Sequence, residues 1–199
     1  MQVPIELIAA IATFGFVTSV TPGPNNTYLL ASGANYGTKK SLGYVNGIMV
    51  GLATMLTAIW LGLGALFVSF PMVYQLLKYL GFAYIVFLAY KVIRSGYQAS
   101  QADVDSRGFV KAIGFQFINP KAWIVSSSFV ATYIPVEKGL SAFLISLTVF
   151  LITTYPGAVI WAAMGQGLSL FLTNQRKRQV FNWVAGLLLI ATMVPALFL

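Results

Sequence analysis

Six long apolar stretches, separated by short polar gaps, account for almost the whole chain. They span residues 3–35, 41–69, 72–93, 109–133, 140–172 and 180–199. About 20 residues suffice for an α-helix to cross the hydrocarbon core of a bilayer. Only 8% of the 199 residues are charged and 58% are hydrophobic, whereas soluble domains carry about 25% charged residues. The pattern predicts an all-α membrane protein with six transmembrane helices that contact the lipid bilayer.

The basic residues gather in alternate gaps between these stretches. One side would hold Lys39, Lys40, Lys91, Arg94, Arg107, Lys111, Arg176, Lys177 and Arg178, and the other only Lys78 and Lys138. Cytoplasmic loops carry an excess of Lys and Arg, so both termini are expected outside the cytoplasm. The same distribution accounts for the net charge of +8 without a nucleic-acid partner, and none is predicted.

The residues needed for most site chemistry are missing. The chain has no His and no Cys, and no Asp or Glu falls deep within an apolar stretch, since Glu6 lies near the outer end of the first. Catalytic residues, metal ligands and cofactors are therefore not expected. A transporter is favoured over a membrane enzyme. The alternative left open is a small-ion or other small-metabolite exporter or channel of similar architecture.

A polar segment, residues 95–108, divides the chain into halves 1–94 and 109–199. Each half has three predicted spans, an odd number, so the second half would enter the membrane with the opposite orientation. The first span of each half is interrupted, at Pro22-Gly23-Pro24 and at Asn119-Pro120. Paired interruptions in two inverted halves are typical of a transporter binding site. The expectation is one transporter domain, 1–199, in which helices 1 and 4 are broken and residues 95–108 form a cytoplasmic linker.

The two interruptions define the candidate substrate site. Proline lacks an N–H, and free backbone groups in hydrocarbon cost several kcal/mol each. A simple proline kink is the alternative interpretation. Lys121 follows the second break, near the predicted midplane, where an ionisable residue indicates function. The predicted substrate-binding residues are Thr21, Pro22, Gly23, Pro24, Asn25, Asn26, Asn119, Pro120 and Lys121.

The charges at this site suggest how an amino acid would bind. The helix that restarts after Pro24 would present its N-terminal N–H groups, which with Lys121 suit a carboxylate. Carbonyls freed near Val20, Thr21 and Asn119, together with the Asn side chains, would accept hydrogen bonds from the α-ammonium. The two halves would then rock around the fixed site to alternate its access.

Other features of the spans leave alternatives open. Three glycines four residues apart, Gly43, Gly47 and Gly51, predict close helix packing within the bundle or, alternatively, a homodimer interface. Tyr44 is expected in an interfacial aromatic belt. The fifth stretch contains Pro156 and is either kinked or split. Some polar residues could line a pathway or only tie helices together: Asn46, Gln116, Tyr155 and Gln166.

Several motifs together resemble the lysine exporter and homoserine/threonine resistance (LysE/RhtB) family. They are Val20-Thr21-Pro22-Gly23-Pro24-Asn25-Asn26, the glycine series, Leu80-Gly81-Phe82-Ala83-Tyr84-Ile85, Leu88-Ala89-Tyr90-Lys91 and Phe117-Ile118-Asn119-Pro120-Lys121-Ala122. The resemblance covers nearly the whole chain in order and length.

This resemblance implies a bacterial cytoplasmic (inner) membrane exporter of amino acids or their derivatives, driven by proton antiport. Its implied partners are an amino-acid substrate and protons. Family members differ in substrate, from basic amino acids to threonine, homoserine, leucine and cysteine-related compounds. The absence of a deep acidic residue disfavours a dibasic substrate such as lysine.

Overall fold

The computed structural model describes residues 3–63, 69, 71–94, 106–134 and 139–194, and all regular structure within them is helical. The elements are α1 (Ile5–Val20), α2 (Pro24–Tyr36), α3 (Thr38–Ala58) with a π-helical turn η1 (Ile59–Leu63), α5 (Pro71–Arg94), α6 (Ser106–Ile118), α7 (Pro120–Tyr133), α8 (Gly139–Ser169) and α9 (Gln175–Ala191). Most of the predicted linker, residues 95–105, lies outside the described residues.

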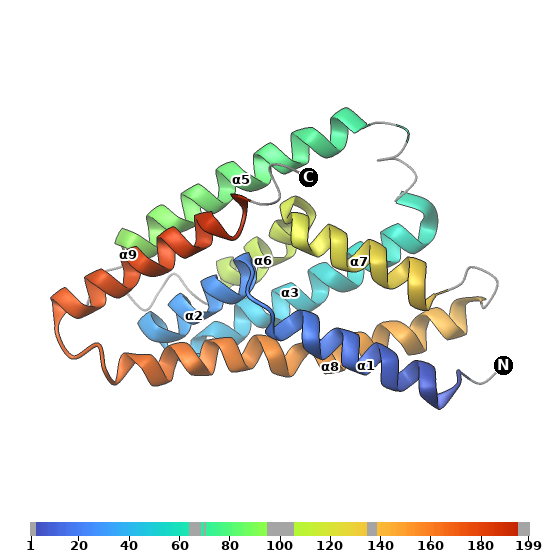
Figure 1. Cartoon of the computed structure of the whole chain (residues 1–199), viewed down its shortest axis with the longest axis horizontal. Helices are drawn as coiled ribbons and strands as arrows, with labels where there is room; N and C mark the ends of the chain where they lie inside the picture. Colours follow the sequence, from blue (N-terminus) through green and yellow to red (C-terminus); the bar gives the residue numbers. More distant parts are fainter. Residues whose placement is uncertain (1–2, 64–68, 70, 95–105, 135–138, 195–199) are drawn as a thin grey trace.

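The helices follow the six apolar stretches and run roughly along the long axis of the molecule (Figure 1). The first stretch forms α1 and α2, separated at Thr21–Gly23, and the fourth forms α6 and α7, separated at Asn119. The predicted breaks in both stretches are therefore confirmed. The angle between α1 and α2 is 59°.

Two segments are long and apolar enough to cross a membrane on their own. They are α3 with η1, 26 residues, and α8, 31 residues. The bent pair α1–α2 passes the same test as one span, which gives up to three among the described residues. The other helices do not reach this threshold alone, so the count of six spans stays a prediction.

α8 is one continuous helix that contains Pro156. Its 31 residues correspond to about 46 Å at the helical rise, against a hydrocarbon thickness of about 30 Å. The fifth apolar stretch is therefore not split in two.

The helices of the two halves pack reciprocally. α1 and α2 contact α8, α6 and α7 contact α3, and α5 contacts α9. Each broken helix thus lies against the second long helix of the other half. Glycines allow both contacts: a Cβ on Gly33 would overlap the backbone of Ala162 in α8, and one on Gly47 would overlap the backbone of Phe109 in α6.

The glycine series of α3 serves this internal packing. A Cβ on Gly51 would lie 2.6 Å from Cγ of Gln116 in α6, and Gly47 is equally enclosed. Packing within the bundle is therefore confirmed for Gly47 and Gly51, because their face is occupied within the chain, and nothing in the structure supports a homodimer interface there. Gly43 is half-buried.

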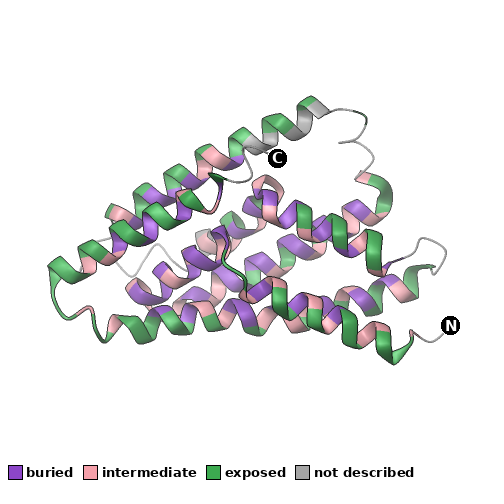
Figure 2. Cartoon of the chain, viewed as in Figure 1, coloured by how far each residue is buried: buried purple, intermediate pink, exposed green. Residues whose placement is uncertain are grey.

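Buried residues lie along the faces of the helices that meet in the bundle, and exposed residues lie on the outward faces (Figure 2). Many of the exposed residues are large and apolar. Ile152 is 65% exposed and Leu187 57%. In a water-soluble protein such surfaces would be unusual, but they suit contact with lipid.

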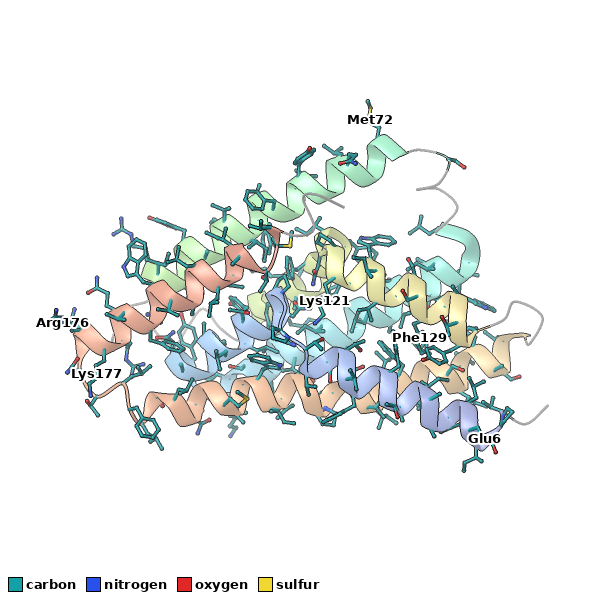
Figure 3. The ribbon with its side chains drawn as sticks, viewed as in Figure 1. Glu6, Met72, Lys121, Phe129, Arg176 and Lys177 are labelled. Carbon is teal, nitrogen blue, oxygen red and sulfur yellow. The ribbon has the colours of Figure 1, made fainter. Side chains whose placement is uncertain are left out.

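Charged side chains mark the ends of the molecule. Figure 3 shows Arg176 and Lys177 at one end, Glu6 at the other and Lys121 between them. The end that carries Arg176 and Lys177, together with Arg94 at the C-terminus of α5, is called the basic end below.

Candidate functional site

The first break leaves carbonyls at the end of α1 without helical partners. In an uninterrupted helix the Thr18 carbonyl would accept from the N–H of residue 22, but Pro22 has none. The Ser19 carbonyl loses its partner because the chain turns at Gly23. Asn26 replaces that partner: its side-chain amide donates to the Ser19 carbonyl at 2.6 Å and the Thr21 carbonyl at 2.7 Å.

The second break is closed by its own residues. Pro120 cannot donate to the Gln116 carbonyl, and the Asn119 N–H does so instead at 3.3 Å. The Asn119 side chain accepts from the Lys121 N–H at 3.1 Å and so caps α7. The Phe117 carbonyl, left free, accepts from the Trp123 indole N–H at 2.7 Å.

Lys121 crosses from the second break to the first. Its Nζ donates to the Thr21 carbonyl at 2.8 Å, Thr21 Oγ1 at 2.9 Å, the Thr18 carbonyl at 3.2 Å and the Pro22 carbonyl at 3.3 Å. The cation therefore lies at the C-terminal end of α1, where the helix dipole is negative. Gly23 leaves the space, since a Cβ there would be 2.7 Å from Lys121 Cδ.

A second connection between the breaks runs through two amides. Asn25 Nδ2 donates to Gln116 Oε1 at 2.9 Å, and Gln116 Nε2 reaches back to Asn25 Oδ1 at 3.4 Å. Gln116 also donates to the Ala112 carbonyl and is fully buried. The Tyr44 hydroxyl lies 3.5 Å from Asn25 Oδ1.

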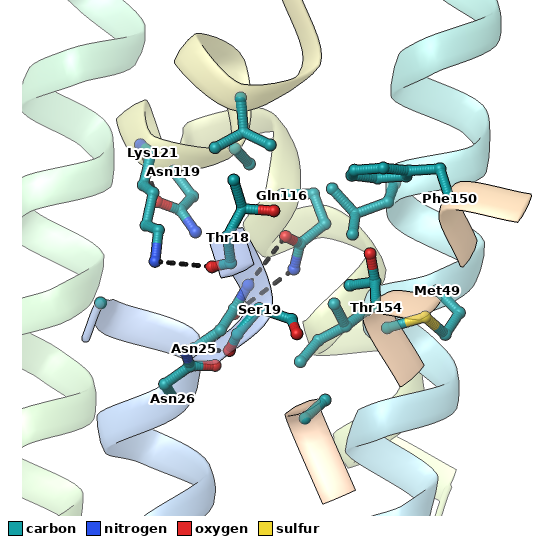
Figure 4. Close-up of a pocket in the computed structure, with 16 residues that line it drawn as sticks. Thr18, Ser19, Asn25, Asn26, Met49, Gln116, Asn119, Lys121, Phe150 and Thr154 are labelled. Atoms are coloured by element: carbon teal, nitrogen blue, oxygen red, sulfur yellow. Dashed lines mark hydrogen bonds between the residues drawn. The ribbon is translucent and has the colours of Figure 1, made fainter. Parts of the chain in front are cut away.

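These polar groups surround a cavity of about 60 Å³ at the meeting point of α1, α2, α3, α6, α7 and α8 (Figure 4). One water molecule requires about 10–15 Å³, so the cavity has room for water. Its polar lining is Thr18, Ser19, Asn25, Asn26, Gln116, Asn119, Lys121 and Thr154, and its apolar lining includes Ile48, Met49, Leu52, Val125 and Phe150.

Five of the nine predicted site residues line this cavity: Gly23, Asn25, Asn26, Asn119 and Lys121. Thr21, Pro22, Pro24 and Pro120 do not. The three prolines contribute through the backbone geometry of the breaks, and Thr21 accepts from Lys121 with its carbonyl and its hydroxyl. The prediction that the carbonyls of Thr21 and Asn119 are free is wrong. The Thr21 carbonyl accepts from Lys121 and Asn26, and the Asn119 carbonyl accepts from the backbone N–H of Trp123 at 3.2 Å.

Sequence reasoning missed several lining residues. Thr18, Ser19 and Thr154 carry small hydroxyls that also occur throughout lipid-facing helices, so no signal separates them. Gln116 was one of four polar residues left open, and it lines the cavity. The other three tie elements together: Tyr155 donates to Asn46 Oδ1 at 3.2 Å, and Gln166 accepts from the Thr38 N–H.

Tyr44 is a further correction. It was expected in an interfacial belt, but it is 3% exposed and lies against Tyr28, with ring centroids 4.4 Å apart. A lone tyrosine near a predicted span end has the same pattern whether it faces lipid or the interior.

Comparison with known proteins adds independent information. The family model described as LysE type translocator matches residues 16–197. The chain is 32% identical to a cysteine/O-acetylserine efflux protein of Klebsiella pneumoniae over 92% of this chain and 93% of that protein. Proteins of the same description from Escherichia coli O139:H28 (32%, over 92% and 94%) and Salmonella choleraesuis (32%, over 80% and 82%) are also similar.

No solved structure matches the chain significantly. The family match and the relatives confirm the resemblance seen in the sequence motifs. The chain belongs to the LysE type translocator family, a family of transporters and not of enzymes.

Proposed function

We propose that this protein is a secondary transporter that exports small neutral amino acids or their derivatives, with cysteine and O-acetylserine as the first candidates. The observation that carries the proposal is the cavity between the two helix breaks, lined by amides and hydroxyls and by one cation, Lys121. The substrates named for the similar efflux proteins supply the candidates.

The charge of the lining supports a neutral substrate. Lys121 is the one charged side chain among the residues that line the cavity, and no carboxylate lies there. A zwitterion offers Lys121 a carboxylate partner. A dibasic amino acid carries a second ammonium group besides its α-ammonium, and none of the residues that line the cavity is acidic to neutralise it. The amides of Asn25 and Gln116 can donate to or accept from a short polar side chain.

The same proposal covers architecture and location. Six spans as two inverted three-helix halves, 1–94 and 109–199, would lie in the bacterial inner membrane with both termini outside the cytoplasm. The reciprocal packing of α1–α2 on α8 and of α6–α7 on α3 supports the repeat. The position of Arg176 and Lys177 opposite Glu6 supports the orientation. Alternating access would then be a rocking of the halves around the cavity.

Proton antiport is part of the proposal. A proton cycle through the cavity has one ionisable group available among the lining residues, Lys121. Efflux that depends on an inward proton gradient and is lost in a Lys121→Met variant would support this role. Gradient-driven efflux that persists in the variant would assign the proton to another group.

Reconstituted vesicles test the transport proposal. Vesicles loaded with labelled cysteine, O-acetylserine or lysine are followed for release. We expect release of the two neutral compounds and little release of lysine. Loss of one charge-assisted hydrogen bond costs about 1.5–3 kcal/mol, so Lys121→Met is expected to slow release about tenfold or more.

Lys177→Met is the matched control, because Lys177 is exposed at the basic end. It should release substrate at the unchanged rate. Asn25→Ala provides a second cavity variant in which the cation is intact. Release of neutral substrates by Lys121→Met and Asn25→Ala at the unmodified rate, with equal protein in the vesicles, would refute the proposed site.

A further inference from the structure

A second hollow lies between the cavity and the basic end of the molecule. It has a volume of about 330 Å³ and is bounded by α2, α5 and α6, with Tyr44 of α3. Its lining includes Tyr28, Tyr36, Tyr44 and Tyr90, with Ser32 and Asn35 of α2. We call it the vestibule. None of the substrate-site residues predicted from the sequence lines it.

One tyrosine pair separates the vestibule from the cavity. On α2, Asn25 lines the cavity and Tyr28, one turn later, lines the vestibule. On α3, Ile48 lines the cavity and Tyr44, one turn earlier, lines the vestibule. The rings of Tyr28 and Tyr44 meet with centroids 4.4 Å apart. The partition on this side is therefore about one helical turn thick, roughly 5 Å.

The opposite side of the cavity is closed much more heavily. Phe150 lines the cavity there and belongs to an aromatic cluster with buried Phe129 and half-buried Phe14 and Tyr133. The rings of Phe129 and Phe150 have centroids 4.5 Å apart, and both side chains are fully buried or nearly so. Figure 3 shows Phe129 on the Glu6 side of Lys121. The thin side thus faces the basic end.

The contact that holds the tyrosine pair to the cavity is weak. The Tyr44 hydroxyl reaches Asn25 Oδ1 at 3.5 Å, the long limit for a hydrogen bond. Asn25 in turn pairs with Gln116. A substrate that binds the Asn25 amide therefore competes with a contact that costs little to break.

The vestibule is positively charged. Lys91, Arg94 and Lys111 line it, and none of the described residues in its lining is acidic. Lys91 Nζ is held 4.9 Å above the Phe87 ring, and the Arg94 guanidinium 5.5 Å from the Tyr90 ring. A low-dielectric hollow lined by one sign of charge concentrates the opposite sign.

The geometry points to the vestibule as the cytoplasmic entrance for carboxylate-bearing substrates, with the Tyr28–Tyr44 pair as the gate between this entrance and the substrate cavity. The inference rests on the proposed export function for the identity of what passes. The gate itself is a property of access and can be measured without transport.

The chain contains no cysteine, so single cysteines can report access without removing native thiols. Gly108→Cys reports the vestibule, because Gly108 lines it and a Cβ there has no atom within 4 Å. Met49→Cys reports the cavity. Both are treated in inside-out vesicles with membrane-impermeant methanethiosulfonates, one anionic and one cationic, and the modification rates are measured.

We expect Gly108→Cys to react rapidly, and faster with the anionic reagent at low salt. Met49→Cys should react slowly while the tyrosine pair is intact. Adding Tyr28→Ala should raise the Met49→Cys rate by about tenfold, because the rate follows the fraction of time that the gate is open. Tyr90→Ala, which changes another vestibule tyrosine, is the matched control and should leave that rate unchanged.

A Met49→Cys rate equal to that of Gly108→Cys with the pair intact would overturn the gate, as would an unchanged rate in Tyr28→Ala. Modification of Gly108→Cys only in right-side-out vesicles would overturn the cytoplasmic entrance. If Tyr28→Ala does not fold, Tyr44→Phe keeps the ring, removes the contact with Asn25 and should still raise the Met49→Cys rate. If the modification rates are as expected but the vesicles release no amino acid, the proposed function is refuted and the gate is supported.

Discussion

At the scale of single residues, the site depends on side chains that replace missing backbone partners. Lys121 and Asn26 both cap the end of α1, but they do so from different places. Lys121 comes from the other half of the chain and lines the cavity with its cation. Asn26 is buried on α2 and bonds two carbonyls of its own break. Their substitution should therefore have different consequences.

Gly23→Ala tests whether the position of the lysine head matters. The added Cβ would lie 2.7 Å from Lys121 Cδ and displace the head from the carbonyls of α1. Loss of one such bond, about 1.5 kcal/mol or more, predicts about tenfold slower substrate release from vesicles. Gly114→Ala is the control, since a Cβ there meets open space. Equal release by both variants would contradict the prediction.

Asn26→Ala should act on stability. It leaves the buried Ser19 carbonyl without its side-chain donor, which costs about 1–3 kcal/mol, and the Thr21 carbonyl with Lys121 alone. We expect a lower thermal midpoint in detergent and a lower protein level in the membrane. Asn25→Ala, which mainly removes cavity contacts, should lower the midpoint less. The reverse order of midpoints would show that the roles of the two asparagines are exchanged.

Single residues also show where sequence reasoning ends. Gly23, Asn25, Asn26, Asn119 and Lys121 could be found because prolines in an apolar stretch are physically costly. Gln116 and Tyr44 could not be assigned, since a polar side chain has the same local pattern whether it lines a cavity or faces a headgroup. Only the packing of the helices shows which of these two environments each side chain has.

At the scale of elements, glycine contacts hold the broken helices against the long ones. The six apolar stretches located every helix that the structure describes. The sequence could not show which stretches are neighbours, and for this reason it left both packing within the bundle and a homodimer interface open for the glycine series. Gly47 and Gly51 follow the same spacing in a helix pair within one chain as between two chains, and the spacing carries no information on the partner.

Gly165→Ala tests the contact between α2 and α8. A Cβ on Gly165 would overlap the backbone of Leu30, whereas one on Gly167 meets nothing within 4 Å. Overpacking of this kind costs about 1–3 kcal/mol. We expect a lower thermal midpoint in detergent for Gly165→Ala and no loss for Gly167→Ala, two residues further along the same helix. Equal midpoints would show that the two helices separate readily.

At the scale of the whole molecule, the distribution of charge predicts topology. Basic side chains gather at one end, and Glu6 lies at the other. With six spans, a phosphatase fused after residue 199 should be active outside the cytoplasm, and a fluorescent protein at the same place should stay dark. Fusions after Gly37, near Lys39 and Lys40, should give the opposite result. A fluorescent C-terminal fusion would contradict the predicted orientation.

The hydrogen bonds that Lys121 donates to the first break also determine the state of the site when no substrate is bound. The carbonyls freed at Thr18 and Thr21 are paired by Lys121 and Asn26, so both have a hydrogen-bond donor when no substrate is bound. A bare group would cost several kcal/mol. In the proposed transport cycle, the empty protein would therefore return without cargo and without unpaired carbonyls at the first break.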